Sequence, residues 1–453
     1  MSPRRPPVHV TSSWRFPQPS SRRLPNGMTA DRFDLPGQRV VTMTLLVDAP
    51  LSAEPSALEG VATLAMRACD EGTVGHPAAA LTEALEGCGA ATIGAGARLD
   101  GAMLTVEAPA TRLAEALPLV SELIREPAFE DGDVARLVDD ALLGIATGEA
   151  SPPVCATKAA YACFGDHRLA RPAGGGAKTV AQLTQDALHS WHRAAVQPKR
   201  CRLIIAGDLP EDTDALIDDA FGSWRAVDGA ATLPAAVPPP AAPRGRVVIV
   251  DHPDAAQASL RLATLVPSRP SQDWPALQVA NAIVGGTFGS RLNQVLREQR
   301  GLTYGANSWL APTRDVAVYM AQAECRVEAA AEAVELSLQL LDLAASPVTP
   351  DEVRDAAAYI TGATPLRLDT AAAVAAQAAD FALGAVAPDW FDDYMAALAR
   401  VTPDDATAAF ARHIRPSSLV VALCGPADVL AGQLQQAGHT VEVVAAAELV
   451  GLS

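Results

Sequence analysis

The sequence is poor in aromatic residues and in basic charge. Phe, Trp and Tyr make up only 4% of the 453 residues, so a hydrophobic core must be built mainly from Ala, Leu and Val. Lys and Arg number 35 against 52 Asp and Glu, which gives a formal net charge of −17. This charge argues against nucleic acid or an anionic membrane surface as a partner, and it favours neutral or basic peptides through long-range steering.

The sequence also lacks long apolar runs and paired cysteines. No run reaches the roughly 18 apolar residues expected of a membrane-spanning helix. The 7 cysteines are scattered and include no Cys-x-x-Cys pair, which is typical of free thiols in a reducing compartment. Residues 1–24 are basic and proline-rich without the apolar segment of a secretory signal, and we interpret them as a disordered tail. We therefore expect a cytoplasmic protein.

A proline-rich segment divides the chain into two parts. The length predicts two or three domains, and residues 227–246 combine prolines with alanines and glycines, as in a semi-extended linker. This places one predicted domain at 25–226 and a second at 247–453.

The predicted elements of the second part repeat those of the first. Thr184 lies as far before Pro198 as Thr402 lies before Pro416, and the two pairs are offset by about 218 residues. In each part a short apolar strand follows the proline, so we predict an internal duplication. We expect strands at 39–47, 91–94, 102–107, 202–206, 247–251, 258–265 and 419–423, and a hairpin at 303–325. We expect helices at 58–69, 78–85, 110–125, 131–148, 154–163, 180–195, 212–224, 273–285, 327–344, 350–361, 367–383, 389–399 and 403–413.

The stretch Gly285–Ser308 (GGTFGSRLNQVLREQRGLTYGANS) predicts a glycine-rich loop, a short helix, a stop and a strand. Ser290 is placed to cap the helix, and Gly301 is placed to end it in the left-handed conformation. Arg297 stands in the last turn, where a cation complements the exposed carbonyl groups. Tyr304 belongs to the alternating pattern of the strand that follows.

This stretch resembles the C-terminal-domain signature of the insulinase/pitrilysin-like metallopeptidases, the family of the mitochondrial processing peptidases. The signature has the form GG-x-x-S-S-R-L-x-x-x-(I/L)-R-E-x-x-G-L-x-Y-x-x-x-S. In that family an Arg seven residues before a Tyr grips the bound peptide, and the positions that match are Arg297 and Tyr304. Without the resemblance, the preferred interpretation of the two residues would be a helix-terminal dipole partner and a half-buried packing tyrosine.

The family's zinc motif, G-x-x-H-x-x-E-H-x-x-x-x-G-T, is present in outline but without its ligands. Residues 60–73 keep the flanking glycines and the threonine. Thr63 replaces the first histidine, Met66 the general base and Arg67 the second histidine, while the resemblance places the third ligand at Gly144. Thr and Met are weak zinc ligands and Arg67 would repel the cation, so we predict neither catalytic residues nor a metal in this chain.

Other candidate sites are weaker. His189 and His192 lie three residues apart on a predicted helix and could share a ligand, although a solvated or capping face explains such a pair as well. Asp139 and Asp140 fit a solvated helix face. Gly174–Gly176 lacks the lysine spacing of a phosphate-binding loop, and we interpret it as a flexible hinge.

The resemblance implies an α+β fold and a subunit role. Each half would be a mixed β-sheet with helices packed on one face, and the two halves would form one bowl-shaped half of a peptidase chamber. In heterodimeric members one chain carries zinc and the other carries the Arg/Tyr grip. We therefore predict a non-catalytic, peptide-binding subunit that is inactive alone and pairs with a homologous zinc-bearing subunit, with no nucleic acid or membrane partner. The alternatives are a structural assembly protein of the same fold and a peptide-binding homodimer. The peptide itself, whether a turnover substrate or a leader segment, is not identified by the sequence.

Overall fold

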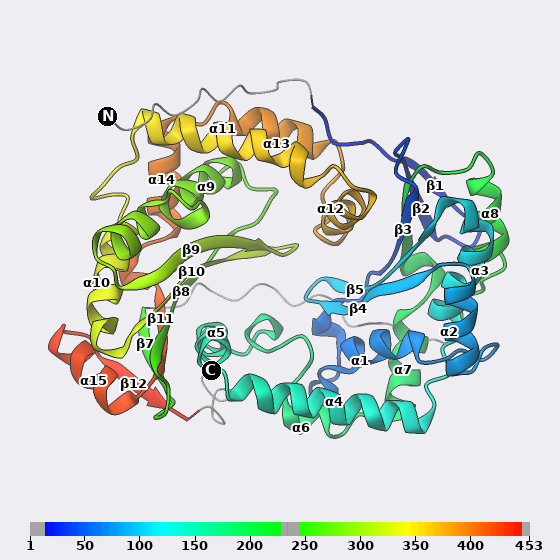
Figure 1. The fold of residues 1–453 in the computed structure, drawn as a ribbon, viewed down its shortest axis with the longest axis horizontal. Coiled ribbons are helices and arrows are strands. Elements are labelled where there is room, and N and C mark those ends of the chain that lie inside the picture. Colours follow the sequence, from blue (N-terminus) through cyan, green and yellow to red (C-terminus); the bar gives the residue numbers. More distant parts are fainter. Residues whose placement is uncertain (1–13, 228–232, 234–244, 446–453) are drawn as a thin grey trace.

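Two six-stranded mixed β-sheets, one from each half of the chain, form the framework of the protein (Figure 1). The computed structural model describes residues 14–227, 233 and 245–445. The strand orders are β1-β2-β6-β3-β5-β4 and β12-β7-β11-β8-β10-β9. Each strand of the first sheet has a counterpart at the same place in the second. This confirms the predicted α+β class and the internal duplication.

The elements of the first half come in the predicted order, apart from β1 and β2, which were not predicted, and the helix predicted at 180–195, which is two helices, α6 and α7. Its strands are β1 (Ser20–Arg23), β2 (Thr29–Asp34), β3 (Val40–Val47), β4 (Ala91–Arg98), β5 (Gly101–Pro109) and β6 (Cys201–Gly207). Its helices are α1 (Val61–Arg67), α2 (Ala78–Gly87), α3 (Leu113–Arg125), α4 (Asp131–Glu149), α5 (Pro152–Ala162), α6 (Ala177–Val180), α7 (Gln185–Ala195) and α8 (Thr213–Phe221).

The second half has a similar order of elements. Its strands are β7 (Arg246–Asp251), β8 (Gln257–Pro267), β9 (Thr303–Pro312), β10 (Val316–Arg326), β11 (Val420–Gly425) and β12 (Val441–Val444). Its helices are α9 (Trp274–Asn281), α10 (Ala330–Leu340), α11 (Pro350–Arg367), α12 (Ala371–Leu383), α13 (Trp390–Leu398), α14 (Pro403–His413) and α15 (Ala427–Gln436), with π-helical segments η7 (Ala282–Gly286) and η8 (Asn293–Gln299).

Each sheet is buried on both faces, which explains why its central strands are continuously apolar. Along β3, Met43 and Leu45 face the core beneath α1 and α3, whereas Leu46 faces the opposite side. That opposite side is covered by α12, a helix of the second half, through residues such as Ala375 and Ala379. The expectation of helices on one face of each sheet was therefore incomplete.

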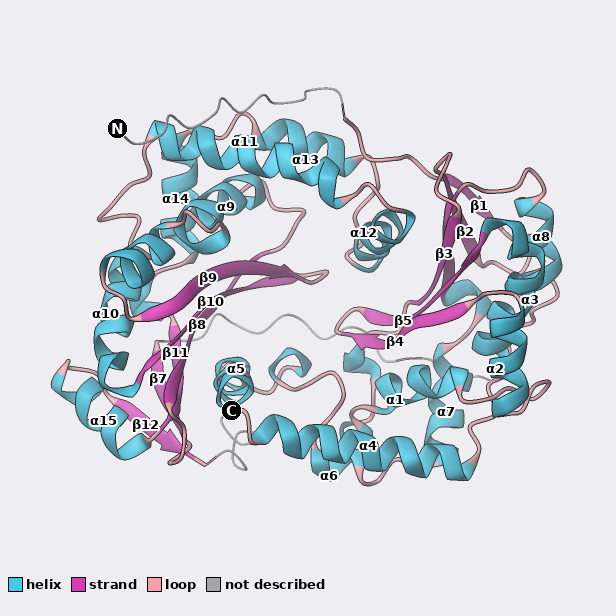
Figure 2. Cartoon of the chain, in the orientation of Figure 1, coloured by secondary structure: helices cyan, strands magenta, loops and turns pink. Residues whose placement is uncertain are grey.

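The second sheet receives a helix from the first half in return. α5 packs on β8 and β11, where Cys155 and Ala159 meet Ala422 and Cys424. Figures 1 and 2 show α5 beside the second sheet and α12 beside the first. Because α5 and α12 occupy equivalent places in the two repeats, the halves are interlocked by a reciprocal exchange of helices.

Part of the predicted N-terminal tail is ordered. Ser20–Arg23 forms β1, which pairs antiparallel with β2. Phe16 is 1% exposed and contacts Phe33, Phe381 and Phe391 edge-on. The tail prediction was wrong for these residues because burial of an aromatic side chain offsets the cost of ordering them. Residues 1–13 and most of the predicted linker at 227–246 lie outside the described residues.

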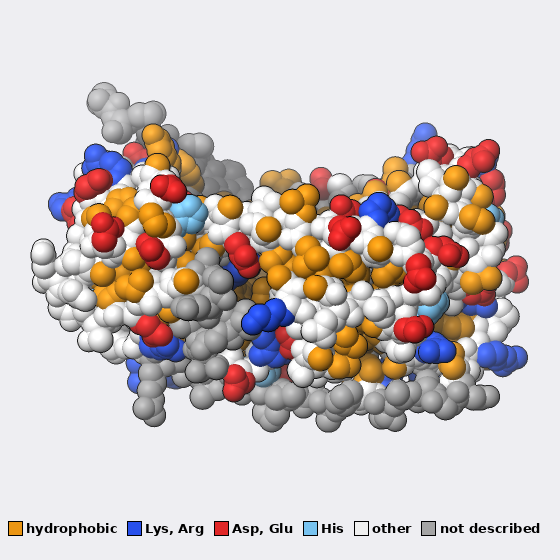
Figure 3. Space-filling model, turned by 90° about the horizontal axis from the view of Figure 1, so that it is seen from below, with side chains coloured by type: hydrophobic (Ala, Val, Ile, Leu, Met, Phe, Trp, Pro, Cys, Tyr) orange, Lys and Arg blue, Asp and Glu red, His pale blue; other side chains and the backbone are white. Residues whose placement is uncertain are grey.

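Two further expectations concern membranes and thiols. Among the described helices, none combines the length and hydropathy needed to cross a bilayer. All seven cysteines are free and buried, as predicted. Figure 3 shows one face of the molecule, on which apolar side chains lie among acidic and basic ones without a broad basic field.

Candidate functional site

The signature segment 285–308 is held in place by close backbone contacts. Gly285 lies against β9, where an added Cβ would be 2.3 Å from the Ser308 Oγ. The Ser308 hydroxyl donates to Asn281 Oδ1 at 2.7 Å, which joins β9 to the end of α9. A side chain at position 285 would collide with Ser308 and break this junction, so the close contact between the two segments requires a glycine there.

Polar contacts fix the helical part of the signature. The Ala306 amide donates to Asn293 Oδ1 at 2.9 Å, which ties η8 to β9. Arg291 donates to both carboxylate oxygens of Glu352 at 2.8 Å, and these bonds lower the pKa of Glu352 to about 2. These residues act as supports for the segment.

The predicted ends of the signature helix are partly correct. Gly301 has a φ of +61°, in the left-handed region, and the Leu302 amide donates to the Leu296 carbonyl at 2.8 Å, which confirms the glycine stop. Ser290 begins the helix through its backbone carbonyl, which accepts from the Gln294 amide. Its hydroxyl caps nothing and is buried without a hydrogen-bond partner among the described residues, so the side-chain cap was wrong. The helix then widens into the π-helical η8, a form often found at functional sites.

The two family-signature residues differ in exposure, since Arg297 is partly exposed and Tyr304 is almost fully exposed. The side chain of Arg297 is 35% accessible, and its guanidinium carbon lies 4.7 Å from the centre of the Phe288 ring. Its nearest carboxylate is that of Glu298, at 3.5 Å. Tyr304 is 91% exposed on β9, the edge strand of the second sheet. This exposure excludes the half-buried packing role that was the alternative for Tyr304.

Phe288 is a site residue that the sequence analysis missed. It is 74% exposed, which is unusual for a large apolar side chain in a chain so poor in aromatics. It stacks against Arg297 and lines a cavity of about 620 Å³ between the signature loop and α11. Its position in the loop just before the helix was the available signal.

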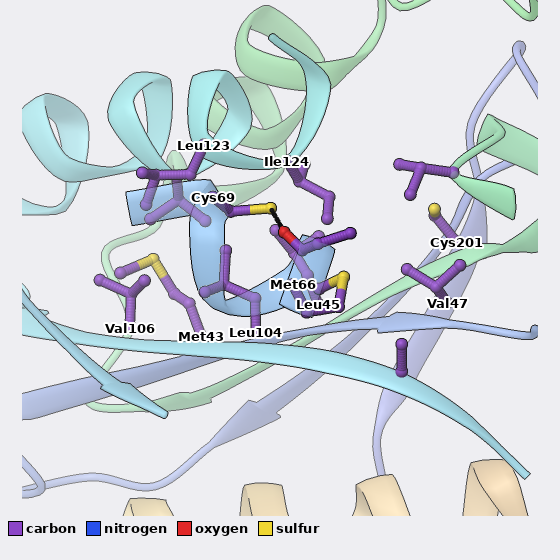
Figure 4. Packing of buried hydrophobic residues seen from close by; sticks show 14 of the residues in the cluster. Met43, Leu45, Val47, Met66, Cys69, Leu104, Val106, Leu123, Ile124 and Cys201 are labelled. Carbon is purple, nitrogen blue, oxygen red and sulfur yellow. Dashed lines mark hydrogen bonds between the residues drawn. The ribbon is translucent and has the colours of Figure 1, made fainter. Parts of the chain in front are cut away.

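The helix of the degenerate zinc motif, α1, is retained, but the four positions that replace the family's functional residues do not all face one cavity. Thr63, Arg67 and Gly144 line one cavity of about 300 Å³ between α1, α4 and α5. Met66 is fully buried among the core side chains Leu45 and Cys69 (Figure 4), and it is not among the residues that line that cavity. The Thr63 hydroxyl donates to the Ala173 carbonyl at 3.0 Å.

This set of donors does not fit zinc. A zinc site of this family type needs imidazole and carboxylate ligands, and the cavity offers a hydroxyl already engaged with a carbonyl, a guanidinium and a glycine. Within the described residues, no group of three or more His, Cys, Asp or Glu side chains is placed to hold a metal ion. No chemical step is therefore assigned to a metal in this chain.

A buried ion-pair network supports the wall of this cavity. Glu54 accepts from the Ala62 amide at 3.0 Å and from Arg168 Nη2 at 2.9 Å, and both side chains are almost fully buried. Burial raises the pKa of Glu54, although Arg168 and the amides oppose the shift. Arg171 pairs in the same way with Glu59 at 2.7 Å. No local pattern in the sequence indicates this network, because its ion pairs join residues that lie far apart along the chain.

The interpretation of Gly174–Gly176 as a flexible hinge was wrong. Gly175 has a φ of +79°, and an added Cβ would lie 2.1 Å from the Glu59 carbonyl oxygen. An added Cβ at Gly60 would lie 2.4 Å from the Gly174 oxygen. The Thr179 hydroxyl donates to the Glu59 carbonyl at 2.8 Å. The glycines thus allow a tight fit of the loop against the start of α1.

The remaining candidates have structural roles. His192 is buried, its Nε2 lies 2.8 Å from the Ile124 carbonyl, and burial lowers its pKa to about 4. His189 and His192 both contact Phe129 edge-on. Asp140 pairs with Arg136 at 3.4 Å, and Asp139 is exposed on α4 as expected of a solvated face.

Comparison with known families assigns both halves to one group of proteins. Residues 34–174 match the model of the insulinase family (peptidase family M16), and residues 182–359 match that of the peptidase M16 inactive domain. An uncharacterized zinc protease of Streptomyces coelicolor is 31% identical over 317 residues, which are 67% of this chain and 66% of the relative. An uncharacterized zinc protease of Mycobacterium leprae is 30% identical over 210 residues, 46% of this chain and 47% of the relative. These matches thus span from about half to just under two thirds of the relatives.

Solved structures show the same fold. The peptidase M16 inactive domain from Pseudomonas fluorescens superposes with a TM-score of 0.82 at 24% identity, covering 90% of this chain and 98% of that one. A protease from Helicobacter pylori gives 0.83 at 17% identity, covering 91% and 100%. A chain of complex III2 from Candida albicans gives 0.76 at 15% identity, covering 93% and 99%. Together with the signature segment and the ligand-free zinc motif, these matches show that the chain belongs to the insulinase-like peptidase family M16 and lacks the family's catalytic motif.

Proposed function

We propose that this chain is the substrate-holding, non-catalytic subunit of a two-chain zinc peptidase. A homologous subunit with an intact zinc motif would supply the metal and the hydrolytic water. This chain would hold an extended peptide near the point of cleavage through Arg297 and Tyr304. The single observation that supports this most is that Tyr304 is 91% exposed on β9 while Arg297, 35% accessible, stacks on the exposed Phe288 of the same segment.

The side chains of the grip suit a peptide backbone. A guanidinium offers a planar set of donors for carbonyl oxygens, and stacking on Phe288 restricts the orientations of Arg297. Tyr304 adds a phenolic donor on β9. Since β9 is an edge strand, its main chain is also open to pairing with an extended segment.

A reconstitution experiment tests this function. The chain is co-expressed with a zinc-bearing relative, and hydrolysis of a library of unstructured peptides is measured. Arg297→Ala is expected to lower turnover by at least about tenfold, since it removes a charge-assisted hydrogen bond to the peptide. Tyr304→Phe should lower it less, because only the hydroxyl is lost.

Arg300→Ala provides the matched control. Arg300 lies in the same helix turn as Arg297, but it is paired with Glu332. Its substitution should leave turnover nearly unchanged, and all three variants should assemble with the partner as the wild type does. Wild-type turnover in both Arg297→Ala and Tyr304→Phe would refute the grip.

The presence of both Arg297 and Tyr304 also argues against a purely structural role. The similarity to a chain of complex III2 shows that this fold occurs in a respiratory assembly. A scaffold has no physical need for an exposed arginine, phenylalanine and tyrosine on one signature segment. If this chain and its zinc-bearing partner assembled without hydrolysing any peptide, a purely structural role would be favoured.

A further inference from the structure

The cavity at the degenerate zinc motif presents cations where the family's motif has metal ligands. Arg67 comes from α1 and Lys158 from α5, and both line the same cavity of about 300 Å³. The proposed role of Arg297 and Tyr304 uses neither residue. The proposed grip therefore does not explain the two cations of this cavity.

Neither cation has a hydrogen bond or an ion pair with another side chain among the described residues. Arg67 is exposed and its nearest electrostatic neighbour is Asp70, while Lys158 is half-buried. Asp140 contributes one carboxylate, which Arg136 contacts at 3.4 Å while also pairing with Glu71 and Asp133, so the charged side chains of the lining are two cations and one anion. The cavity thus holds an excess of positive charge inside a chain whose formal net charge is −17.

The shape of the cavity favours a small group at the end of a chain. Its walls include Gly144 and Gly174, at which an added Cβ would meet no other atom within 4 Å. Thr63 in the lining contacts the Gly96 position of β4, since an added Cβ there would lie 4.0 Å from its methyl group. β4 is an edge strand of the first sheet, so an extended peptide paired with it would pass near the Thr63 wall of the cavity.

We infer that this cavity is an anion site that binds a carboxylate group of a peptide, with Arg67 and Lys158 as its ligands. The carboxylate can come from the C-terminus of the peptide or from an acidic side chain. A singly charged group balances a lining in which two cations stand against the one carboxylate of Asp140. More highly charged anions are disfavoured by the negative charge of the whole chain.

Binding to the isolated full-length chain tests the inference. The probes are fluorescent alanine-rich pentapeptides with a free C-terminus, with an amidated C-terminus, and with an amidated C-terminus and one internal Asp, together with inorganic phosphate as a competitor. We expect the free-carboxylate peptide to bind at least about tenfold more tightly than the amidated one, and binding to weaken with salt. If the Asp peptide recovers this affinity, an acidic side chain is also accepted; if it does not, the site is specific for the chain end.

Substitutions then assign the binding to the cavity. Arg67→Gln and Lys158→Gln should each weaken binding of the free-carboxylate peptide about tenfold, to the level of the amidated peptide. Arg112→Gln is the control, since Arg112 is outside the cavity and pairs with Glu115. Circular dichroism verifies that each variant is folded. Equal binding of free and amidated peptides by the wild type, wild-type affinity in both cavity variants, or displacement by phosphate at lower concentration than by the peptide would overturn the inference. Because no partner or turnover is involved, failure here leaves the Arg297 test unaffected.

Discussion

At the scale of single residues, buried charge shapes the wall of the degenerate zinc cavity. Glu54 and Arg168 are separated by 114 positions, yet their side chains are 1% and 4% exposed and joined by a 2.9 Å contact. Arg168 also donates to the carbonyls of Arg171, Pro172 and Ala173. These bonds hold the glycine loop against α1, so that Thr63 and Arg67 face a formed cavity.

Arg168→Met should destabilise the protein strongly. It leaves the Glu54 carboxylate buried without its partner, which we expect to lower the free energy of unfolding by about 3–5 kcal/mol. Chemical denaturation measures the change. Arg112→Met, which breaks an exposed ion pair with Glu115, should cost less than about 1 kcal/mol. Equal stability of the two variants would contradict the structural role of the network.

His192 should make stability depend on pH. Burial lowers its pKa to about 4 in the folded chain, against about 6.5 when unfolded, so the unfolded state binds more protons between these values. Stability is therefore full above about pH 6.5 and falls as the pH drops toward 4, by up to about 1.4 kcal/mol per unit. Denaturation at several pH values should show this slope reduced in His192→Gln. His189→Gln is the control, and an equal effect of both would rule out His192 as the source.

The sequence predicted some site residues and could not predict others. Arg297 and Tyr304 were found because they stand at fixed spacing within one segment. Phe288 was overlooked because a loop aromatic has no periodicity to mark its exposure. Glu54 and Arg168 carry no local signal at all, since their contact depends on how the chain folds back across 114 positions.

At the scale of elements, the exchanged helices decide how the two sheets are covered. The strand positions of β3, β8 and β11 followed from short apolar runs, and the helix expected at 403–413 has the bounds of α14. The partner of α12 could not be predicted in this way. Its helical periodicity is the same whichever sheet it packs on, and contact with β3 across the molecule is set by tertiary packing.

A charge placed where α12 contacts the first sheet should show whether this contact stabilises the protein. Ala379 is fully buried against the first sheet, so Ala379→Glu would place a carboxylate in an apolar contact and lower the melting temperature by several degrees or more. Ala376→Glu on the exposed side of the same helix is the control and should melt like the wild type. Thermal denaturation followed by circular dichroism compares them. Identical melting would show that α12 does not stabilise the first sheet.

At the scale of the whole molecule, the two duplicated halves differ in which of the family's functional residues they keep. The second half keeps an exposed arginine and tyrosine on its signature segment, while the first half keeps the helix of the zinc motif but places Met66 in the core. The exchanged helices α5 and α12 pack each half against the sheet of the other. In this account hydrolysis requires a second chain, and this chain contributes the means to hold the peptide.

Metal content and peptide hydrolysis, measured on the isolated chain and again after mixing with a zinc-bearing relative, test this account most directly. We expect the isolated chain to retain no stoichiometric zinc after dialysis and to cleave no peptide, and we expect cleavage to appear with the relative at a rate above that of the relative alone. An isolated chain that holds about one zinc ion per molecule and hydrolyses peptides would contradict it.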